Sequence, residues 1–505
     1  MNLAAFAIQN ALVHPNRPAV SVHDDVRFTY AQLASRGRAI AGWLRKGLRL
    51  EAGDRIALYL PNSPEYLEIM VGVWHAGLAV VPVNHKLHPK ELAYILENSG
   101  ASLCFCDGEK FDAIAASGVH LPSVLVNVSD GEYARAVTHD GIDCQDVAPG
   151  DLAWLFYTSG TTGLPKGAAL SHRNLLMMCL SYYADLDSIS QRDAIIHSAP
   201  MSHGSGLYGL AHYLKGANQV IPLNPHFDPD EIAVLLRTYT GTTLFAAPTM
   251  VRRMAQSAAM GRTNLNNLKN IIYGGAPMYR DVLDEALEVF GARLSQIYGQ
   301  GESPMTITAL PKEAHFNGIS TRSDDLLSSV GYARTGVEVR VVDGAGRALP
   351  TGEIGEVVVR GDVVMKGYWN NRQATEAAIK NGWLHTGDMG SFDNRAALTL
   401  VDRSKDVIIS GGSNIYPREV EEVLLRHPAV RDVAVIGQPD AEWGEAVVAF
   451  IVPEAGAAPD VQELDDICLS SLARFKRPKQ YKFVQSIPYN AYGKVSKVEL
   501  RKFVQ

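Results

Sequence analysis

The chemistry-bearing stretch of this sequence is residues 157–167, YTSGTTGLPKG. Its glycines let the backbone approach a ligand closely, and its free N–H groups, hydroxyls and Lys166 suit anionic phosphate oxygens. The spacing does not fit a Walker A loop. A surface turn rich in small residues is the alternative, but it is disfavoured because this loop follows a buried strand and ends in Pro-Lys-Gly. The stretch therefore predicts a polyphosphate-binding loop.

Regular elements are expected on both sides of this loop. The apolar run at 152–157 (LAWLFY) predicts a buried strand. Residues 171–180 (SHRNLLMMCL) predict a helix with Ser171 as its N-cap. The loop would then sit between a strand and a helix, where backbone N–H groups can face an anion.

Four further clusters recur along the chain. Residues 297–304 (IYGQGESP) could stack a base and hold a divalent ion, and 385–388 (HTGD) could accept ribose hydroxyls. The others are 402–422, beginning DRSKD, and 488–494 (PYNAYGK). Singly each is weak, because a TGD turn or a terminal GK is usually only a loop. Together, in this order, they indicate nucleotide chemistry.

Length and composition limit the class of protein. The chain has 505 residues, too many for one core, and 47% hydrophobic with 20% charged residues is an ordinary soluble balance. The net charge of −7 argues against nucleic acid as a partner. Five scattered cysteines lack zinc spacing and are expected to be reduced and structural. Neither a secretory signal nor a membrane span is expected, so the predicted location is cytoplasmic.

The order of expected elements predicts an α/β protein of two domains. Residues 54–84 alternate strand, helix and strand, which implies a parallel sheet, and the alternation recurs to about residue 310. Residues 330–365 predict a β-rich subdomain with Gly and Asp turns. A compact unit follows. The predicted domains are 1–404 and 405–505.

These motifs, in order from about residue 25 to 500, resemble those of the adenylate-forming acyl-CoA synthetase (AMP-binding) superfamily. They are similar to those of acyl- and aryl-CoA ligases such as 4-chlorobenzoate:CoA ligase. The resemblance implies a large N-terminal domain of two α/β subdomains plus a β-rich subdomain, with a small mobile α+β C-terminal domain. It also implies two half-reactions: carboxylate and ATP give acyl-AMP and pyrophosphate, and the acyl group then passes to a thiol.

The resemblance also implies an ATP/AMP-binding set. It comprises Thr158, Ser159, Thr161, Thr162, Lys166, Gly274, Gly275, Ala276, Tyr298, Gly299, Asp388 and Arg403. The loop residues would hold the β- and γ-phosphates. Tyr298 would stack on adenine against residues 274–275, where bare backbone lets the ring lie close. Asp388 would accept both ribose hydroxyls, and Arg403 would reach ribose or phosphate.

Three residues carry the implied catalytic roles. Glu302 would bind Mg²⁺, a hard cation that prefers oxygen ligands. Lys494 would contact the carboxylate and α-phosphate oxygens in the adenylation step and leave for the second step, with Lys405 at the hinge. His203 matches a position bordering the substrate carboxylate, although a loop histidine with its own partners is the alternative.

Two positions depart from the superfamily pattern. The threonine usual before the glutamate is Gly301, which removes a hydroxyl near the α-phosphate. The arginine or lysine frequent after the proline of the last motif is Tyr489. Both departures concern the detailed geometry around AMP.

The thiol could belong to CoA or to a carrier-protein pantetheine. Trp443, Phe475, Arg477 and Lys479 are disposed like CoA-nucleotide contacts in the aryl-CoA ligases, and Gly412 would line the pantetheine tunnel. An aromatic face suits adenine, and a cation suits the 3′-phosphate. The alternative is a solvated basic loop beside a core tryptophan.

The acid pocket is expected near residues 203–208, 273–277 and 300–304. These stretches contain no arginine or lysine, so a dicarboxylate is disfavoured. Tyr208, Tyr273 and Met305 favour an apolar aromatic, cyclic or medium- to long-chain monocarboxylic acid, and neighbouring glycines suggest room for more than acetate.

The predicted activity is therefore ATP-dependent acid–CoA ligation, with ATP, Mg²⁺ and CoA required and a homodimer left open. A carrier-protein acylating enzyme is the first alternative. A non-catalytic nucleotide-binding protein and a luciferase-like oxidase are others.

Overall fold

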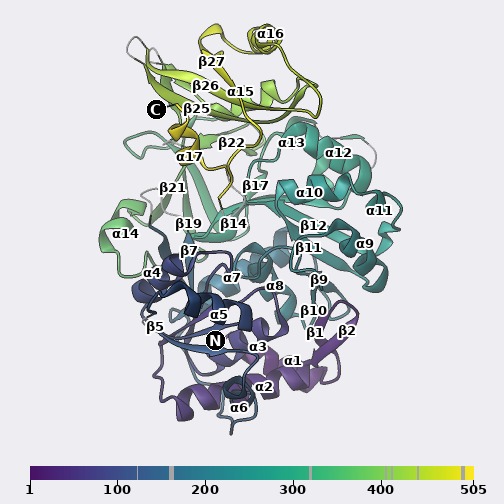
Figure 1. The fold of residues 1–505 in the computed structure, drawn as a ribbon, viewed down its shortest axis with the longest axis vertical. Helices are drawn as coiled ribbons and strands as arrows, with labels where there is room; N and C mark the ends of the chain where they lie inside the picture. Colours follow the sequence, from purple (N-terminus) through teal and green to yellow (C-terminus); the bar gives the residue numbers. More distant parts are fainter. Residues whose placement is uncertain are drawn as a thin grey trace.

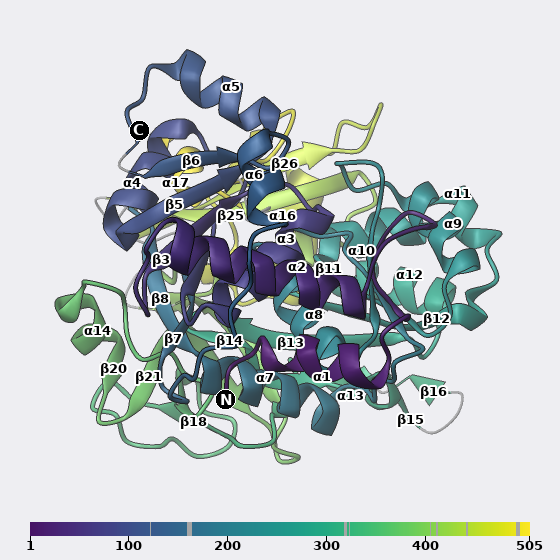
Figure 2. The ribbon, with the colours of Figure 1, turned by 90° about the horizontal axis from the view of Figure 1, so that it is seen from below.

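The computed structural model describes residues 1–121, 123–158, 164–317, 321–322, 324–403, 406–410, 413–440, 443–490 and 495–504. Strands and helices alternate through the first three hundred residues, and four main sheets form (Figures 1 and 2). The predicted α/β class is confirmed.

A six-stranded sheet holds the strand before the predicted phosphate loop. Its order is β6 (Val124–Asn127), β5 (Ala101–Cys106), β3 (Arg55–Tyr59), β4 (Ala79–Pro82), β7 (Leu152–Thr158) and β8 (Lys166–Ser171). Neighbouring strands are parallel except β7 and β8. The helices of this region are α2 (Tyr30–Gly42), extended by the π-helical turn η1 (Trp43–Gly47), α3 (Pro64–His75), α4 (Pro89–Ser99), α5 (Gly108–Ser117) and α6 (Gly131–Ala136). The β3–α3–β4 unit confirms the expected parallel crossover.

A nine-stranded sheet forms the second α/β part. Its order is β17 (Tyr332–Ala333), β14 (Ser303–Leu310), β13 (Leu294–Gln300), β12 (Leu268–Gly274), β11 (Thr242–Ala246), β9 (Ala194–Ile196), β10 (Asn218–Ile221), β1 (Pro18–Val22) and β2 (Asp25–Thr29). The helices are α1 (Ala5–Val13), α7 (His172–Asp185), α8 (Gly204–Leu214), α9 (Pro229–Thr238), α10 (Pro248–Ala255), α11 (Ala258–Gly261) and α12 (Arg280–Phe290). One buried core joins both large sheets through α2, α3, α7 and α8, and another lies under α9, α10 and α12.

The β-rich part is longer than the sequence pattern indicated. Its sheet contains β18 (Val337–Val342), β19 (Gly355–Gly361), β20 (Ile379–Lys380), β21 (Trp383–Phe392) and β22 (Leu398–Arg403). It therefore extends to residue 403 rather than 365. The HTGD motif lies inside β21, where alternate residues are buried.

The C-terminal unit has its own sheet and two small cores. Its elements are β23 (Ile408–Ser410), β24 (Ser413–Ile415), α15 (Pro417–Leu424), β25 (Val430–Asp440), β26 (Gly444–Pro453), α16 (Val461–Ser471), β27 (Gln480–Phe483) and α17 (Lys497–Lys502). Figure 1 shows this unit at one end of the molecule, with α16 and β27 at its outer side. The domain limits 1–404 and 405–505 stay a prediction.

Short elements complete the description. They are η2 (Leu265–Asn267), η3 (Lys312–His315), β15 (Phe316–Asn317), β16 (Thr321–Arg322), α13 (Asp324–Leu327), α14 (Arg372–Ala378) and η4 (Arg474–Lys476). Across the described ranges, every helix is too short or too polar to span a bilayer.

Candidate functional site

The predicted phosphate loop is the connection of a β-hairpin. Strands β7 and β8 are antiparallel, and Thr158 pairs with Lys166 across them. Thr158 and Lys166, both predicted to bind ATP, therefore stand at the two ends of the loop. Ser171 caps α7 by accepting a hydrogen bond from the backbone N–H of Asn174 (3.2 Å), as predicted. Strand β8 itself was not expected.

Three loop residues of the predicted set, Ser159, Thr161 and Thr162, lie outside the described residues.

Glu302 lies beside this hairpin and is 9% exposed. Its Oε1 accepts hydrogen bonds from Thr158 Oγ1 (3.3 Å) and from Tyr368 Oη (2.7 Å). Lys166 Nζ lies 4.6 Å from the centre of the Tyr368 ring. Tyr368 therefore connects the loop lysine to the glutamate. The sequence reasoning missed this tyrosine, because nothing in its local GYW context distinguishes it from a core aromatic residue.

The glutamate suits a hard cation. Within the described residues its second oxygen, Oε2, makes no hydrogen bond, so one oxygen stays available for coordination. No group of three or more metal-ligating side chains exists in that part of the chain. A divalent ion held by Glu302 would accordingly take further ligands from phosphate and water, as Mg²⁺ commonly does.

Asp388 forms the second carboxylate cluster. Its Oδ2 accepts from Tyr298 Oη (2.7 Å) and Gln300 Nε2 (2.7 Å), and its Oδ1 accepts from Arg403 Nε (2.8 Å). Burial and the Asp388 charge raise the pKa of Tyr298, which keeps the phenol a donor. A carboxylate offers about four acceptor positions, so binding of both ribose hydroxyls requires one present donor to leave. Among the three donors to Asp388, Arg403 has the most exposed side chain.

The glycines near Tyr298 differ in what surrounds them and so in why a side chain would be excluded. A Cβ on Gly274 would lie 2.5 Å from the carbonyl oxygen of Ile297, so strand packing alone requires glycine there. Gly275 has φ +83 and open space around it, and Ala276 beside it is half-buried. A Cβ on Gly299 would meet the Met305 backbone at 2.6 Å across the β13–β14 hairpin.

Phe156 explains the departure at Gly301. A Cβ at position 301 would lie 2.5 Å from both Phe156 Cδ1 and Thr158 Cγ2. The phenyl ring therefore fills the space that a threonine side chain would need. The same ring meets His203 edge to face, with centroids 5.2 Å apart. His203 Nδ1 also lies 2.8 Å from Ser202 Oγ. The structure thus brings His203 close to the hairpin and the glutamate turn.

The residues expected to line the acid pocket lie in two different places. A Cβ on Gly204 would meet Phe245 Cε1 at 2.5 Å and Met305 Cε at 2.9 Å, so these residues converge at the start of α8. Tyr208 Oη donates to the carbonyl oxygen of Met305 (3.2 Å). The expectation for Tyr273 is wrong. It faces the core under α9, α10 and α12, where its Oη contacts Gln296 Oε1, because residues alternate across β12.

The residues predicted to bind CoA do not all lie together. Lys479 Nζ lies 5.3 Å from the centre of the Trp443 ring, and that ring is 41% exposed. Phe475 is also exposed. Arg477, however, forms an ion pair with Asp465 of α16. The structure therefore joins an aromatic face to Lys479 and engages Arg477 elsewhere.

The remaining predicted residues of the C-terminal unit lie outside the described residues: Gly412, Lys405 and Lys494. Tyr489, the second departure, donates from Oη to Asp432 Oδ2 (2.9 Å) and pairs with Val495 in a β-bridge.

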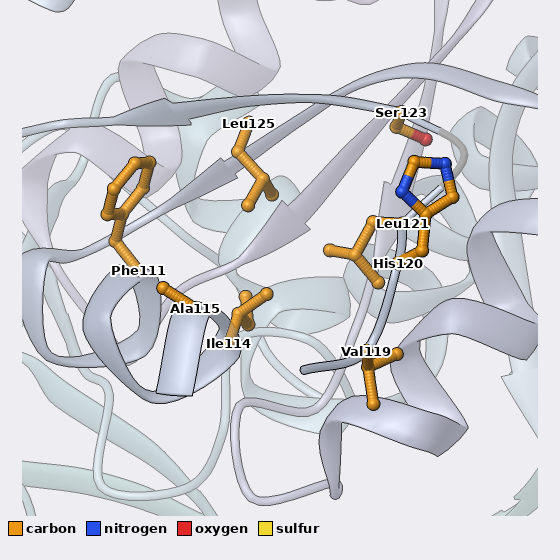
Figure 3. A pocket seen from close by; sticks show the side chains of 8 residues that line it. All are labelled: Phe111, Ile114, Ala115, Val119, His120, Leu121, Ser123 and Leu125. Atoms are coloured by element: carbon orange, nitrogen blue, oxygen red, sulfur yellow. The ribbon is translucent and has the colours of Figure 1, made fainter. Parts of the chain in front are cut away.

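A separate surface hollow of about 380 Å³ lies between α5 and β6 (Figure 3). Its lining residues are Phe111, Ile114, Ala115, Val119, His120, Leu121, Ser123 and Leu125. It borders β6, the edge strand, whereas the phosphate loop leaves β7 near the other edge. None of the predicted site residues lines it.

Comparison with known proteins places this site in a family. Residues 8–369 match the AMP-binding enzyme family, and residues 419–494 match the AMP-binding enzyme C-terminal domain. The chain belongs to this family. It is 35% identical over 503 residues to a feruloyl-CoA synthase of Amycolatopsis sp, covering 99% of this chain and 98% of that protein. It is an AMP-forming enzyme of the acid–CoA ligase kind.

A second relative is named for transfer of the acyl group to a carrier protein rather than to CoA. The chain is 35% identical over 492 residues to the fatty acid–[acyl-carrier-protein] ligase ScoC of Streptomyces coeruleorubidus, covering 96% of this chain and 93% of that protein.

A solved structure of similar fold is ATP-bound MatB from Rhodopseudomonas palustris, with a TM-score of 0.90, 31% identity and coverage of 100% and 99% of the two chains. The apo structure of the same MatB gives a TM-score of 0.80 at nearly equal coverage, 99% and 98%. The described arrangement is thus more similar to the ATP-bound form of MatB.

Proposed function

We propose that this protein adenylates an apolar monocarboxylic acid with ATP and transfers the acyl group to CoA. One observation carries the proposal: the turn after β13 joins two separate carboxylate clusters. Tyr298 and Gln300 hold Asp388, and Glu302, two residues further, meets Thr158 and Tyr368. A single turn thereby sets the distance between a predicted ribose acceptor and a predicted metal ligand.

The residues of these clusters suit distinct parts of ATP. Lys166 stands at the end of the phosphate loop and would bind the β- and γ-phosphates. Asp388 would exchange a present donor for the ribose hydroxyls, and Arg403 would then be free to reach phosphate. Glu302 would hold Mg²⁺ through Oε2. The ion would supply neutralisation of phosphate charge as pyrophosphate leaves.

The arrangement also suits the reaction of the substrate carboxylate with ATP. His203 lies between the hairpin and the pocket residues Gly204 and Phe245. A carboxylate placed beside His203 would face the phosphate loop, where attack on the α-phosphorus would occur. Lys494, the lysine of the last motif, would stabilise the charge that develops there.

The acid is proposed to be aromatic, cyclic or medium- to long-chain. Support comes from the apolar residues Phe245, Tyr208 and Met305, and from the feruloyl-CoA synthase relative. Transfer to a carrier-protein thiol is a second candidate, and the acyl-carrier-protein ligase relative favours it.

A pyrophosphate-release screen tests both candidates. The purified protein is given ATP, Mg²⁺ and a panel of aryl, cyclic and fatty acids, with CoA, with holo-carrier protein, or with neither. Acyl-CoA formation with one acid class is the expected result. Acyl transfer to the carrier protein with indifference to CoA would support the second candidate. Absence of acyl-AMP with every acid would overturn both.

A further inference from the structure

A buried arginine lies behind the proposed acid pocket, in a stretch that the pocket prediction did not include. Arg334 follows β17 and is 2% exposed. Its Nε donates to Asp185 Oδ2 (3.0 Å) at the end of α7. Asp185 also accepts from Thr335 N (2.9 Å), Thr335 Oγ1 (2.6 Å) and Ser181 Oγ (3.1 Å). The aspartate therefore accepts four hydrogen bonds, and it balances the guanidinium charge.

The other end of the guanidinium has unused donors. Nη1 and Nη2 are both buried, and neither makes a close, well-directed hydrogen bond to a described residue, although the Tyr208 hydroxyl is a neighbouring acceptor. Leaving such donors unpaired in a protein interior is destabilising, because the hydrogen bonds they made to water are not replaced. Buried polar groups nearly always have partners, so an acceptor from outside the chain is a physical explanation.

These donors lie next to the pocket residues. Burial raises the pKa of Tyr208, and the charge of Arg334 and a hydrogen bond between the two side chains oppose that rise, so the guanidinium and the Tyr208 hydroxyl are neighbours. Tyr208 Oη in turn touches the Met305 carbonyl. Gly204 and Tyr208 are four residues apart on α8 and therefore share one face of the helix. This face leads from His203, past Phe245 and Met305, to Tyr208, which neighbours Arg334.

We propose that Arg334 is a specificity-determining residue that donates from Nη1 and Nη2 to an oxygen at the far end of the acid. This inference rests on the proposed acid–CoA ligase function. An acid lying along this face would place its carboxylate by His203 and its distal end by Arg334. The flexible Met305 side chain would have to move aside to admit it.

The charge balance selects the chemistry of the distal group. Because Asp185 already neutralises Arg334, a second carboxylate would bury an uncompensated negative charge. A neutral acceptor, such as a hydroxyl, methoxy or keto oxygen, would satisfy the donors without that cost. The aromatic walls, including Tyr208 and Phe245, with ring centroids 6.1 Å apart, suit an aryl ring. The proposed class is an aryl or arylalkenoic monocarboxylic acid with a distal neutral oxygen.

Matched substrates test the proposal without any variant. The kcat/KM of the wild-type enzyme is measured for cinnamic, 4-hydroxycinnamic, 4-methoxycinnamic and 4-carboxycinnamic acids, with ATP and CoA. The expected result is at least about a tenfold preference for the hydroxy or methoxy acid over cinnamic acid, because only they pair the buried donors. The dicarboxylic acid should be the poorest substrate.

Two arginine variants separate specificity from folding. Arg334→Lys keeps a cation for Asp185 but loses the planar fork of donors, so the preference should fall to within about threefold. Arg360→Lys is the matched control, because Arg360 forms an exposed pair with Glu338 on the β-rich sheet. Its preference should equal that of the wild type.

Several results would overturn the inference. Equal wild-type use of cinnamic and 4-hydroxycinnamic acids would do so even if Arg334→Lys failed to fold. An unchanged preference in Arg334→Lys, or rapid turnover of the dicarboxylic acid, would also do so. Turnover of fatty acids but of no aryl acid would refute the role of Arg334 and leave acid–CoA ligation standing. Absence of product with every acid would refute the proposed function itself.

Discussion

Tyr279 of the large domain donates a hydrogen bond from Oη to Glu421 Oε2 of the C-terminal unit, at 3.0 Å. Glu421 also accepts from the backbone N–H of Val435 through Oε1 (2.8 Å). Burial raises the pKa of both Glu421 and Tyr279. Tyr279 follows the glycine pair 274–275 by four residues. The contact therefore ties the C-terminal unit to the predicted adenine-binding loop.

Removing this contact should weaken the arrangement that resembles ATP-bound MatB. We expect Tyr279→Phe to slow single-turnover acyl-AMP formation several-fold, because a hydrogen bond contributes roughly 0.5–1.5 kcal/mol. Thioester formation from supplied acyl-AMP and CoA should change little. Glu421→Ala should act similarly, and the double variant should be no slower than either single one. Additive losses would show that the two residues act independently.

Gly301 and Phe156 should be coupled through the space they share. Gly301→Thr places a Cβ 2.5 Å from Phe156 Cδ1, so it should lower the melting temperature and kcat/KM for ATP. Adding Phe156→Ala should recover part of both losses by making room for the threonine. Phe156→Ala alone is the control and should destabilise by about 3–5 kcal/mol, the usual cost for a buried phenylalanine. Failure of the double variant to improve on Gly301→Thr would contradict this steric explanation.

The sequence predicted best what depends on local chemistry. The strand before the phosphate loop, the cap at Ser171 and the βαβ unit at 54–84 are confirmed because apolar periodicity and capping residues act over short distances. Tyr368 and Arg334 were missed because their roles arise from contacts across more than sixty residues with Glu302 and Asp185. Tyr273 was misplaced because the face of a strand depends on packing.

Glu302 should control the requirement for a divalent ion. Glu302→Gln keeps the size of the side chain but removes its charge, so saturation should need several-fold more Mg²⁺ in the pyrophosphate-release assay. Tyr368→Phe is the matched comparison, because it removes a donor to Oε1 and leaves the carboxylate in place. Its Mg²⁺ titration should shift less. An unchanged titration in Glu302→Gln would reject the assignment.

Lys494 should serve only the first half-reaction. We expect movement of the C-terminal unit to present Lys494 for this step and to remove it for the next. We expect Lys494→Ala to reduce acyl-AMP formation by about 10²-fold or more, since the charge that develops at the α-phosphate would lose its partner. Thioester formation from supplied acyl-AMP should stay nearly intact. Equal losses in both steps would contradict alternation of the two domains.

Lys479, rather than Arg477, should bind the nucleotide of CoA. Lys479 lies over the exposed Trp443 ring, whereas Arg477 pairs with Asp465 on α16. Lys479→Ala should raise KM for CoA about tenfold and leave KM for ATP unchanged, because a charge-assisted contact to the 3′-phosphate is lost. Trp443→Ala should raise KM for CoA as well.

Dephospho-CoA provides the decisive comparison. The wild-type enzyme should prefer CoA to dephospho-CoA, and Lys479→Ala should lose that preference, because the cation and the phosphate are the two halves of one contact. Arg477→Ala is the control and should keep most of the preference while losing stability, because Asp465 loses its cation. If Lys479→Ala discriminates as well as the wild type does, Lys479 does not contact the 3′-phosphate. If the wild type itself is indifferent to CoA, transfer to a carrier-protein thiol becomes the favoured reaction.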